Sequence, residues 1–328
     1  MGISTKFMGY NIKSPIVVGS CGLTSNIETL KKIEQAGAGA VILKSLFEEQ
    51  ITQEMNVNVK VYSANFSGYP EAYNYIEEHT KGEVIAKYIK LIKDAKANLS
   101  IPVIASINCI TASEWLPFVK MVEDAGADGI ELNMFILPSD ISISHEDVER
   151  FYEDIVHIIK RATTLPISLK ISYYFSSLTR FAQKISWLGI ANLNIFNRFY
   201  ESDINIDTFE TVPVNIKSSH DELYNTIRWT AIISPEVRCS LTAGNGVHKA
   251  DDIIKLLLAG ANTVQIVSVL YDEGLNFIVE ANNKLQDWMK EKNFSSINDF
   301  RGKMAVKKNK DASAFYRVQF MKYYSGIE

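Results

Sequence analysis

Apolar and polar residues form two alternating kinds of segment along this 328-residue chain. Stretches with apolar residues three and four positions apart predict amphipathic helices, and short continuous apolar runs predict buried strands. At several junctions from helix to strand the sequence reads Ala-Gly-Ala, as at Gly37, Gly126 and Gly260. Glycine is favoured there because the chain leaves a helix through the left-handed region. Helices and strands that follow each other in this way predict a parallel sheet.

The number of units favours a closed barrel over an open sheet. Eight strands and eight helices match a (β/α)8 TIM barrel, as one domain over residues 1–328. The alternative, an open doubly wound sheet, usually carries a G-x-G-x-x-G turn after its first strand, and Gly19-Ser-Cys-Gly22 lacks that spacing. The predicted strands are 16–19, 40–43, 103–106, 129–132, 167–170, 193–196, 239–242 and 263–266, and the predicted helices are 27–36, 83–98, 115–125, 147–162, 177–188, 221–233, 249–259 and 275–290.

Long insertions interrupt the pattern after strands 2, 4 and 6, at residues 47–82, 134–146 and 197–220. All three leave the carboxyl ends of strands, where barrel enzymes build their active sites. Aromatic residues crowd the first insertion and either pack it onto the barrel rim or form a lid over a flat ligand. These residues are Tyr62, Phe66, Tyr69, Tyr73 and Tyr75.

Composition narrows the possible partners and the compartment. The chain is 47% hydrophobic and 22% charged with a formal net charge of −4, so no basic surplus indicates nucleic acid or a membrane surface. Three scattered cysteines provide no disulfide framework, iron–sulfur cluster or four-cysteine zinc site. The first fourteen residues read as a broken strand pair without the apolar core of a signal peptide. We therefore predict a cytoplasmic protein.

Two lysines and a small-residue turn indicate an anionic ligand. Lys44 and Lys170 end otherwise apolar strands, and each would need an anion, a nearby carboxylate or solvent for its ammonium group. After strand 7 the turn Ala243-Gly244-Asn245-Gly246 would let backbone N–H groups approach an anion at a helix N-terminus. Ser268, after strand 8, lies where this fold usually binds phosphate.

Three asparagines, Asn108, Asn133 and Asn197, lie at or just beyond strands 3, 4 and 6. Amides both donate and accept hydrogen bonds, which suits the edge of a heterocycle such as flavin or pyrimidine. Each alone could equally hold a loop in place. The five histidines show no metal-ligand spacing.

Over nearly its whole length the sequence resembles dihydroorotate dehydrogenases of the soluble class. The similarity runs from Ser4-Thr-Lys-Phe-Met-Gly9 to Phe294-Ser-Ser-Ile-Asn-Asp-Phe-Arg-Gly-Lys303. Ser45-Leu-Phe-Glu-Glu-Gln50 and Phe196-Asn-Arg-Phe-Tyr200 look most like a branch called dihydroorotate-dehydrogenase-like proteins. The resemblance implies a (β/α)8 barrel that holds FMN at the carboxyl ends of its strands.

The same resemblance implies a set of site residues. Lys170 matches the flavin lysine of strand 5, where a cation stabilises the negative charge of the reduced ring. Asn108, Asn133 and Asn197 are the expected substrate contacts. The expected FMN contacts are Gly19, Ser20, Lys44, Ser45, Ser106, Asn133, Lys170, Ala243, Gly244, Asn245, Gly246, Val267 and Ser268.

One departure from the family pattern concerns the catalytic base. The family motif after strand 4 places a cysteine or serine base where this chain has Ile136, and a substrate-binding asparagine where it has Pro138. An aliphatic side chain cannot accept a proton, and general-base catalysis typically contributes about 10²–10⁴-fold to the rate. Candidate replacements are Ser139, Tyr173, Tyr174 and Tyr200, and the sequence does not select among them.

The sequence therefore predicts an FMN-dependent oxidoreductase that acts on a small, flat, unsaturated substrate. The alternatives are dihydroorotate dehydrogenase itself with a displaced base, or a non-redox barrel that binds flavin or phosphate. The resemblance also implies a homodimer. The electron acceptor is not identified, and without a cysteine cluster an iron–sulfur relay would have to come from another subunit.

Overall fold

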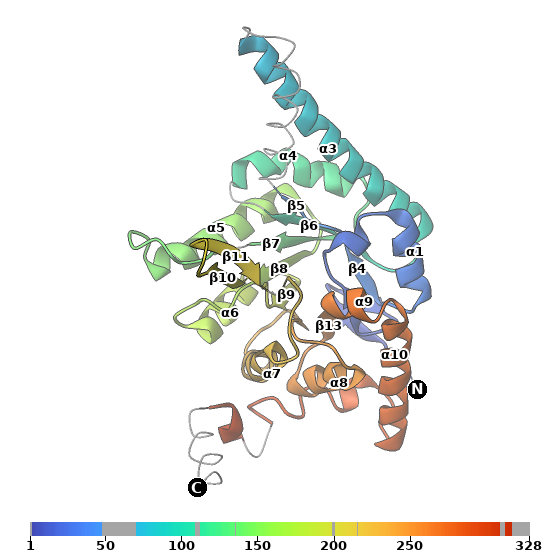
Figure 1. Ribbon diagram of the computed structural model, residues 1–328. Helices are drawn as coiled ribbons and strands as arrows, with labels where there is room; N and C mark the ends of the chain where they lie inside the picture. The colour runs from blue at the N-terminus through green and yellow to red at the C-terminus, as the bar shows by residue number, and fades with distance from the viewer. Residues whose placement is uncertain are drawn as a thin grey trace.

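The computed structural model describes residues 2–47, 70–108, 112–134, 136–198, 201–214, 216–308 and 312–316. One continuous sheet of nine strands contains eight parallel barrel strands and the short β5 (Leu46–Phe47), which pairs with β6. The pairing of β4 with β6 closes the barrel (Figure 1). The predicted (β/α)8 TIM barrel is therefore confirmed. The strands, in chain order, are β3 (Ile16–Val18), β4 (Ala40–Ile42), β6 (Val103–Asn108), β7 (Gly129–Asn133), β8 (Ile167–Ile171), β9 (Asn192–Ile195), β12 (Ser240–Ala243) and β13 (Thr263–Ile266).

Helices surround the barrel, and most begin and end within three residues of the predicted positions. Their buried faces carry the apolar residues that defined the helical period, and Gly260 leaves α8 at φ +122°, as expected for its Ala-Gly-Ala junction. The helices are α1 (Ile27–Gln35), α3 (Pro70–Asn98), α4 (Ala112–Asp124), α5 (His145–Ala162), α6 (Leu178–Trp187), α7 (Glu222–Ile233), α8 (Ala250–Ala259), the short α9 (Ser268–Asp272) and α10 (Asn276–Glu291).

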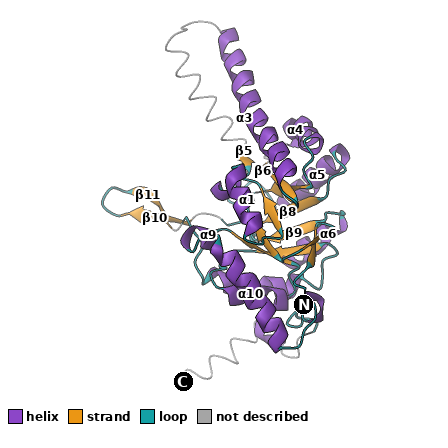
Figure 2. Cartoon of the chain, turned by 90° about the vertical axis from the view of Figure 1, so that its right-hand side faces the viewer, coloured by secondary structure: helices purple, strands orange, loops and turns teal. Residues whose placement is uncertain are grey.

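Helix α3 differs from the prediction because it begins at Pro70 rather than near residue 83. The sequence suggested a boundary at Gly82, yet glycine inside a helix costs only about 1 kcal/mol relative to alanine. The second half of the predicted insertion at 47–82 is therefore helical, and α3 extends well beyond the barrel (Figures 1 and 2). Tyr73 and Tyr75 belong to this helix, whereas Tyr62, Phe66 and Tyr69 lie outside the described residues.

Two antiparallel hairpins accompany the barrel. The first, β1 (Thr5–Phe7) and β2 (Tyr10–Ile12), is the predicted strand pair near the N-terminus. The second, β10 (Glu201–Asn205) and β11 (Glu210–Val214), lies in the insertion after strand 6 and was not predicted. Figure 2 shows this second hairpin projecting away from the barrel.

The inside of the barrel divides into an apolar end and a polar middle. The N-terminal hairpin closes the apolar end, where Phe7 and Met8 pack with Val17, Ile42 and Ile104. Further along the strands the inward positions carry buried polar side chains that hydrogen bond to one another. They are Glu131, Ser168, Asn192, Asn194, Thr242 and Thr263.

Candidate functional site

A cavity of about 910 Å³ lies beyond this polar layer, and residues at or just beyond the carboxyl end of each barrel strand line it. Most of the predicted site residues meet there, although they come from eight different strands. The predicted residues in the wall are Ser20, Lys44, Ser45, Asn108, Asn133, Lys170, Asn197, Asn245, Gly246, Val267 and Ser268. The predicted Gly19, Ser106, Ala243 and Gly244 are not among the described lining residues.

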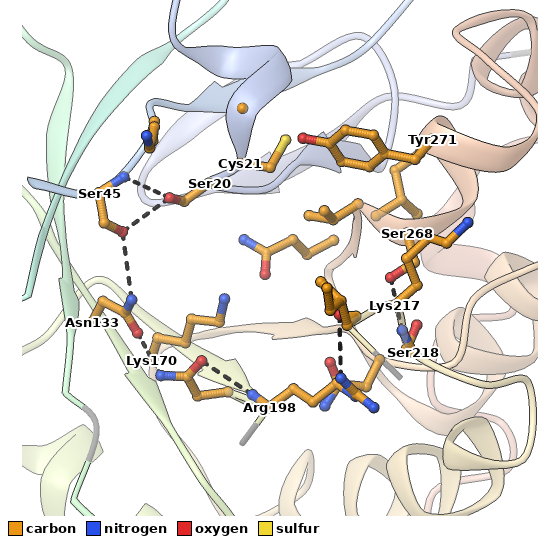
Figure 3. Close-up of a pocket in the computed structure, with 18 of the residues that line it drawn as sticks. Ser20, Cys21, Ser45, Asn133, Lys170, Arg198, Lys217, Ser218, Ser268 and Tyr271 are labelled. Atoms are coloured by element: carbon orange, nitrogen blue, oxygen red, sulfur yellow. Dashed lines mark hydrogen bonds between the residues drawn. The ribbon is translucent and has the colours of Figure 1, made fainter. Parts of the chain in front are cut away.

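Ser106 lies behind the wall, where it supports a chain of hydroxyl groups. Its Oγ lies 2.7 Å from Oγ of Ser45, which lies 2.9 Å from Oγ of Ser20. The backbone N–H of Ser45 also donates to Oγ of Ser20 at 2.7 Å (Figure 3). The network fixes the turns after β3 and β4 against β6. Gly19 supports the same region by its size, because a Cβ there would lie 2.7 Å from the side chain of Gln265.

The asparagines are joined to one another in the wall. Nδ2 of Asn197 donates to Oδ1 of Asn133 at 2.5 Å, and Nδ2 of Asn133 reaches Oγ of Ser45 at 3.4 Å. Asn108 is buried at the end of β6. The side chains of Asn133 and Asn197 are thereby held in one orientation, which suits recognition of a fixed donor and acceptor pattern.

The cavity is cationic. Lys44, Lys170, Arg198 and Lys217 line it, and no acidic residue is among its described lining residues. Figure 3 shows the side chain of Lys170 extending into the cavity. Two of the cations also have acidic partners outside the wall. Nε of Arg198 donates to Oε1 of Glu222 at 3.0 Å, and Lys217 pairs with Asp272.

The turn after β12 is held rigidly at the start of α8. Backbone N–H groups of His248 and Lys249 donate to the buried Asp252 at 3.2 and 2.9 Å. Burial opposes ionisation of Asp252, yet the hydrogen bonds from Lys255, these two backbone groups and His220 lower its pKa below the ordinary value. The carboxylate therefore fixes the end of the turn whose residues Asn245, Gly246 and Val247 line the cavity.

A segment that returns from the second hairpin crosses the same region. Ser218 N–H donates to Oγ of Ser268 at 3.0 Å, and the carbonyl of Ser218 lies 2.7 Å from Nε2 of His248. Together with Lys217 and Asp272, these contacts join this segment to the loops after β12 and β13. It brings Lys217 and Ser218, which the sequence analysis missed, into the cavity wall.

A carboxyl group lies beneath the cavity, inside the barrel. Glu131 on β7 is fully buried and accepts from Nδ2 of Asn194 at 2.8 Å and Oγ of Ser168 at 3.3 Å. Burial raises its pKa, and the positive charge of Lys170 on the neighbouring strand opposes that shift. No sequence reasoning pointed to this residue.

Of the proposed replacements for the missing base, the three that the structure describes, Ser139, Tyr173 and Tyr174, do not line the cavity. Ile136 is half-buried, packs against the hydrophobic core and is not among the described lining residues. The hydrogen bond to Tyr174, with burial, raises the pKa of the exposed Tyr173 to about 12. Ser139 is exposed in the loop after β7, and Tyr200 lies outside the described residues. The thiol of Cys21 and the hydroxyl of Tyr271 do lie in the wall.

Comparison with known proteins identifies the family to which the chain belongs. The model of the family described as dihydroorotate dehydrogenase matches residues 2–289. The chain belongs to the dihydroorotate dehydrogenase family. It is accordingly an oxidoreductase of the kind that acts on CH–CH groups. The resemblance drawn from the sequence motifs is confirmed.

Similarity to individual members of this family is distant but spans the chain. A catalytic subunit of dihydroorotate dehydrogenase B (NAD(+)) from Thermoplasma volcanium is 25% identical, covering 93% of this chain and 99% of its own length. The NAD-dependent dihydropyrimidine dehydrogenase subunit PreA of Escherichia coli K12 is 24% identical, over 92% of this chain and 76% of its own. A dihydroorotate dehydrogenase (fumarate) of Lachancea kluyveri is 23% identical over 92% of this chain and 98% of its own.

One property of the chain outside the site is also observed. None of the described helices is both long and apolar enough to cross a bilayer.

Proposed function

We propose that this member of the dihydroorotate dehydrogenase family is an FMN-dependent oxidoreductase acting on a small, flat, unsaturated substrate. The observation that carries the proposal is the cavity itself, in which cations and fixed amides converge and no described acidic residue lines the wall. A flavin phosphate is a dianion and a reduced flavin is an anion, so both need positive charge or N–H donors.

The residues present fit FMN. The buried side chain of Gln265 borders the cavity, and its Nε2 has no hydrogen-bond partner within normal distance among the described residues, so a ligand could accept from it in competition with the nearby carboxyl group of Glu131. Asn245, Gly246 and Ser268 would hold the phosphate, and Lys170 would stabilise negative charge on the ring. When bound, FMN would supply the hydride acceptor. The remaining predicted contacts, Lys44, Ser45 and Asn133, border the same space.

Two experiments test the cofactor. The visible spectrum of the purified protein should contain a flavin band, and mass spectrometry of the heat-released cofactor should identify FMN, at one per chain. Finding FAD, or a chain that refuses FMN on reconstitution, would overturn the proposal and favour a barrel that binds another phosphorylated ligand.

The second candidate function is oxidation of dihydroorotate itself. Two of the three relatives described above are dihydroorotate dehydrogenases by name, which favours this activity. Ile136 and Pro138 oppose it, because neither side chain can accept a proton or supply an amide contact. We therefore place a different flat substrate first. A homodimer and a cytoplasmic location stay predictions.

A further inference from the structure

The buried carboxyl group of Glu131 uses only one of its two oxygens in the hydrogen bonds that join it to the neighbouring strands β8 and β9. Both of its hydrogen bonds, from Asn194 and Ser168, go to Oε2. Its Oε1 has no hydrogen-bond partner among the described residues. The amide of Gln265 lies beside the carboxyl group and also lines the cavity, so it lies between Glu131 and the ligand space.

Among the described residues, few charged groups act on Glu131. Lys170 on β8 is the cation that acts on it. Tyr88 on α3 is the other titratable group facing it, and burial raises the pKa of that hydroxyl far enough to keep it neutral. The neighbours contributed by β8, β9 and β13 are Ser168, Asn194 and Gln265, which carry no charge. Burial, the charge of Lys170 and these uncharged neighbours therefore act together on the protonation of Glu131, and Lys170 is the one among them whose charge a bound anion can offset.

Two opposing effects act on this carboxyl group. Burial raises its pKa because the charged form is poorly solvated, and the ammonium group of Lys170 lowers it. Lys170 also lines the cavity, so an anion that binds beside it would offset its charge. The carboxylate would then lose its stabilising partner while staying buried, and protonation would become favourable.

We propose that Glu131 takes up a proton when negative charge enters the cavity beside Lys170, and releases that proton when the charge leaves. Applied to redox turnover, the inference rests on the proposed flavin function. Reduction by hydride brings two electrons and one hydrogen nucleus from the substrate and leaves one negative charge in the cavity. A solvent proton then moves through the cavity onto a carboxylate oxygen of Glu131. No further oxidant or reductant is involved.

This assigns Glu131 a positioning role, because it acts through the charge of Lys170 and does not touch the ligand space. While the cavity is neutral, the charge of Lys170 on the neighbouring strand favours the carboxylate form of Glu131. When an anion arrives, the carboxyl group becomes neutral, and Lys170 offers its full charge. The buried region therefore keeps a nearly constant net charge.

The test compares FMN-loaded wild type with Glu131→Gln, which keeps the shape but cannot exchange the proton. Glu236→Gln is the matched control, because Glu236 precedes β12 at the opposite end of the barrel and pairs with Lys307 at 3.0 Å. The reduction potential of each protein is measured by dye equilibration over a range of pH. The wild-type potential should fall more steeply with pH, by one extra proton per two-electron reduction over the range in which Glu131 titrates, and Glu236→Gln should follow it.

Equal steepness in wild type and Glu131→Gln would overturn the inference and leave the proposed function standing. A protein that refuses FMN would instead overturn the proposed function. The inference is then still tested without flavin, by infrared titration of the protonated carboxyl band in wild type and Lys170→Met. The band that Glu131→Gln removes should persist to a pH about one unit or more higher in Lys170→Met. Equal midpoints would disprove the coupling between the two residues.

Discussion

Gly246, in the turn that would hold the phosphate, allows the stability cost of a substitution to be predicted. This residue has φ +72°, and a Cβ built on it would lie 2.1 Å from N and 2.6 Å from Cα of Leu223. Those atoms belong to the first turn of α7 and cannot rotate aside as a side chain would. Leu223 is fully buried, so any displacement disturbs the core as well.

The expected cost of Gly246→Ala has two parts. A left-handed conformation costs a non-glycine residue about 1–2 kcal/mol. An ordinary carbon contact is about 3.5 Å, so the start of α7 would have to move by more than about 1 Å. Overpacking of this kind typically costs about 1–3 kcal/mol more. The total for Gly246→Ala is therefore about 2–5 kcal/mol.

Gly274→Ala is the matched control, because Gly274 has φ +73° and a Cβ there meets nothing within 4 Å. It carries only the backbone cost. Urea unfolding of wild type and the two variants should show Gly246→Ala to be less stable than Gly274→Ala by about 1–3 kcal/mol. Because Glu222 precedes Leu223 and pairs with Arg198 in the cavity wall, Gly246→Ala should also weaken FMN binding. Equal unfolding midpoints for the two variants would refute the assignment of a backbone collision.

Three further outcomes are expected. Lys170→Ala should weaken FMN binding and lower the flavin reduction potential, since it removes a cation beside the reduced ring; an unchanged potential by dye equilibration would mean that Lys170 does not face the flavin. Dihydroorotate should reduce the wild-type flavin extremely slowly in anaerobic stopped-flow mixing, and Ile136→Cys should restore a trace at most, because Ile136 packs on the core and Pro138 still lacks an amide; rapid bleaching in wild type would contradict this. Asp252→Asn should cost about 1–3 kcal/mol of stability at neutral pH. Because the folded pKa of Asp252 is lowered, the deficit should shrink as the pH falls through that lowered value, and a deficit that is constant in acid would contradict it.

The barrel was readable from the sequence because each of its units is local. The eight apolar runs and their Ala-Gly-Ala junctions lie within short windows, and strand ends placed Lys44, Lys170 and the asparagines at one edge. The second hairpin could not be predicted from the sequence. Its strands are almost wholly exposed, so they lack a buried face and with it the alternation that marks a strand. Without the hairpin, the return of Lys217 and Ser218 to the cavity could not be foreseen.

Other site residues were missed although a local signal existed. Arg198 directly follows Asn197, and its position beside a predicted substrate contact was enough to include it. Glu131 stands between apolar neighbours in a buried strand, the same signal that drew attention to Lys170. What no local signal could provide is the pairing of the two, which depends on the register between β7 and β8.

The polar layer inside the barrel also constrains how the strands can align. Side-chain hydrogen bonds connect five adjoining strands, from Thr263 through Thr242, Asn192 and Ser168 to Glu131. A slip of one residue in any of these strands would turn its polar side chains outward against the helices. Each buried polar group left without a hydrogen bond would then cost about 1–3 kcal/mol of stability. Valine and isoleucine side chains, in contrast, pack acceptably on either face. The layer therefore acts against misaligned barrels during folding and selects a single stagger of the strands.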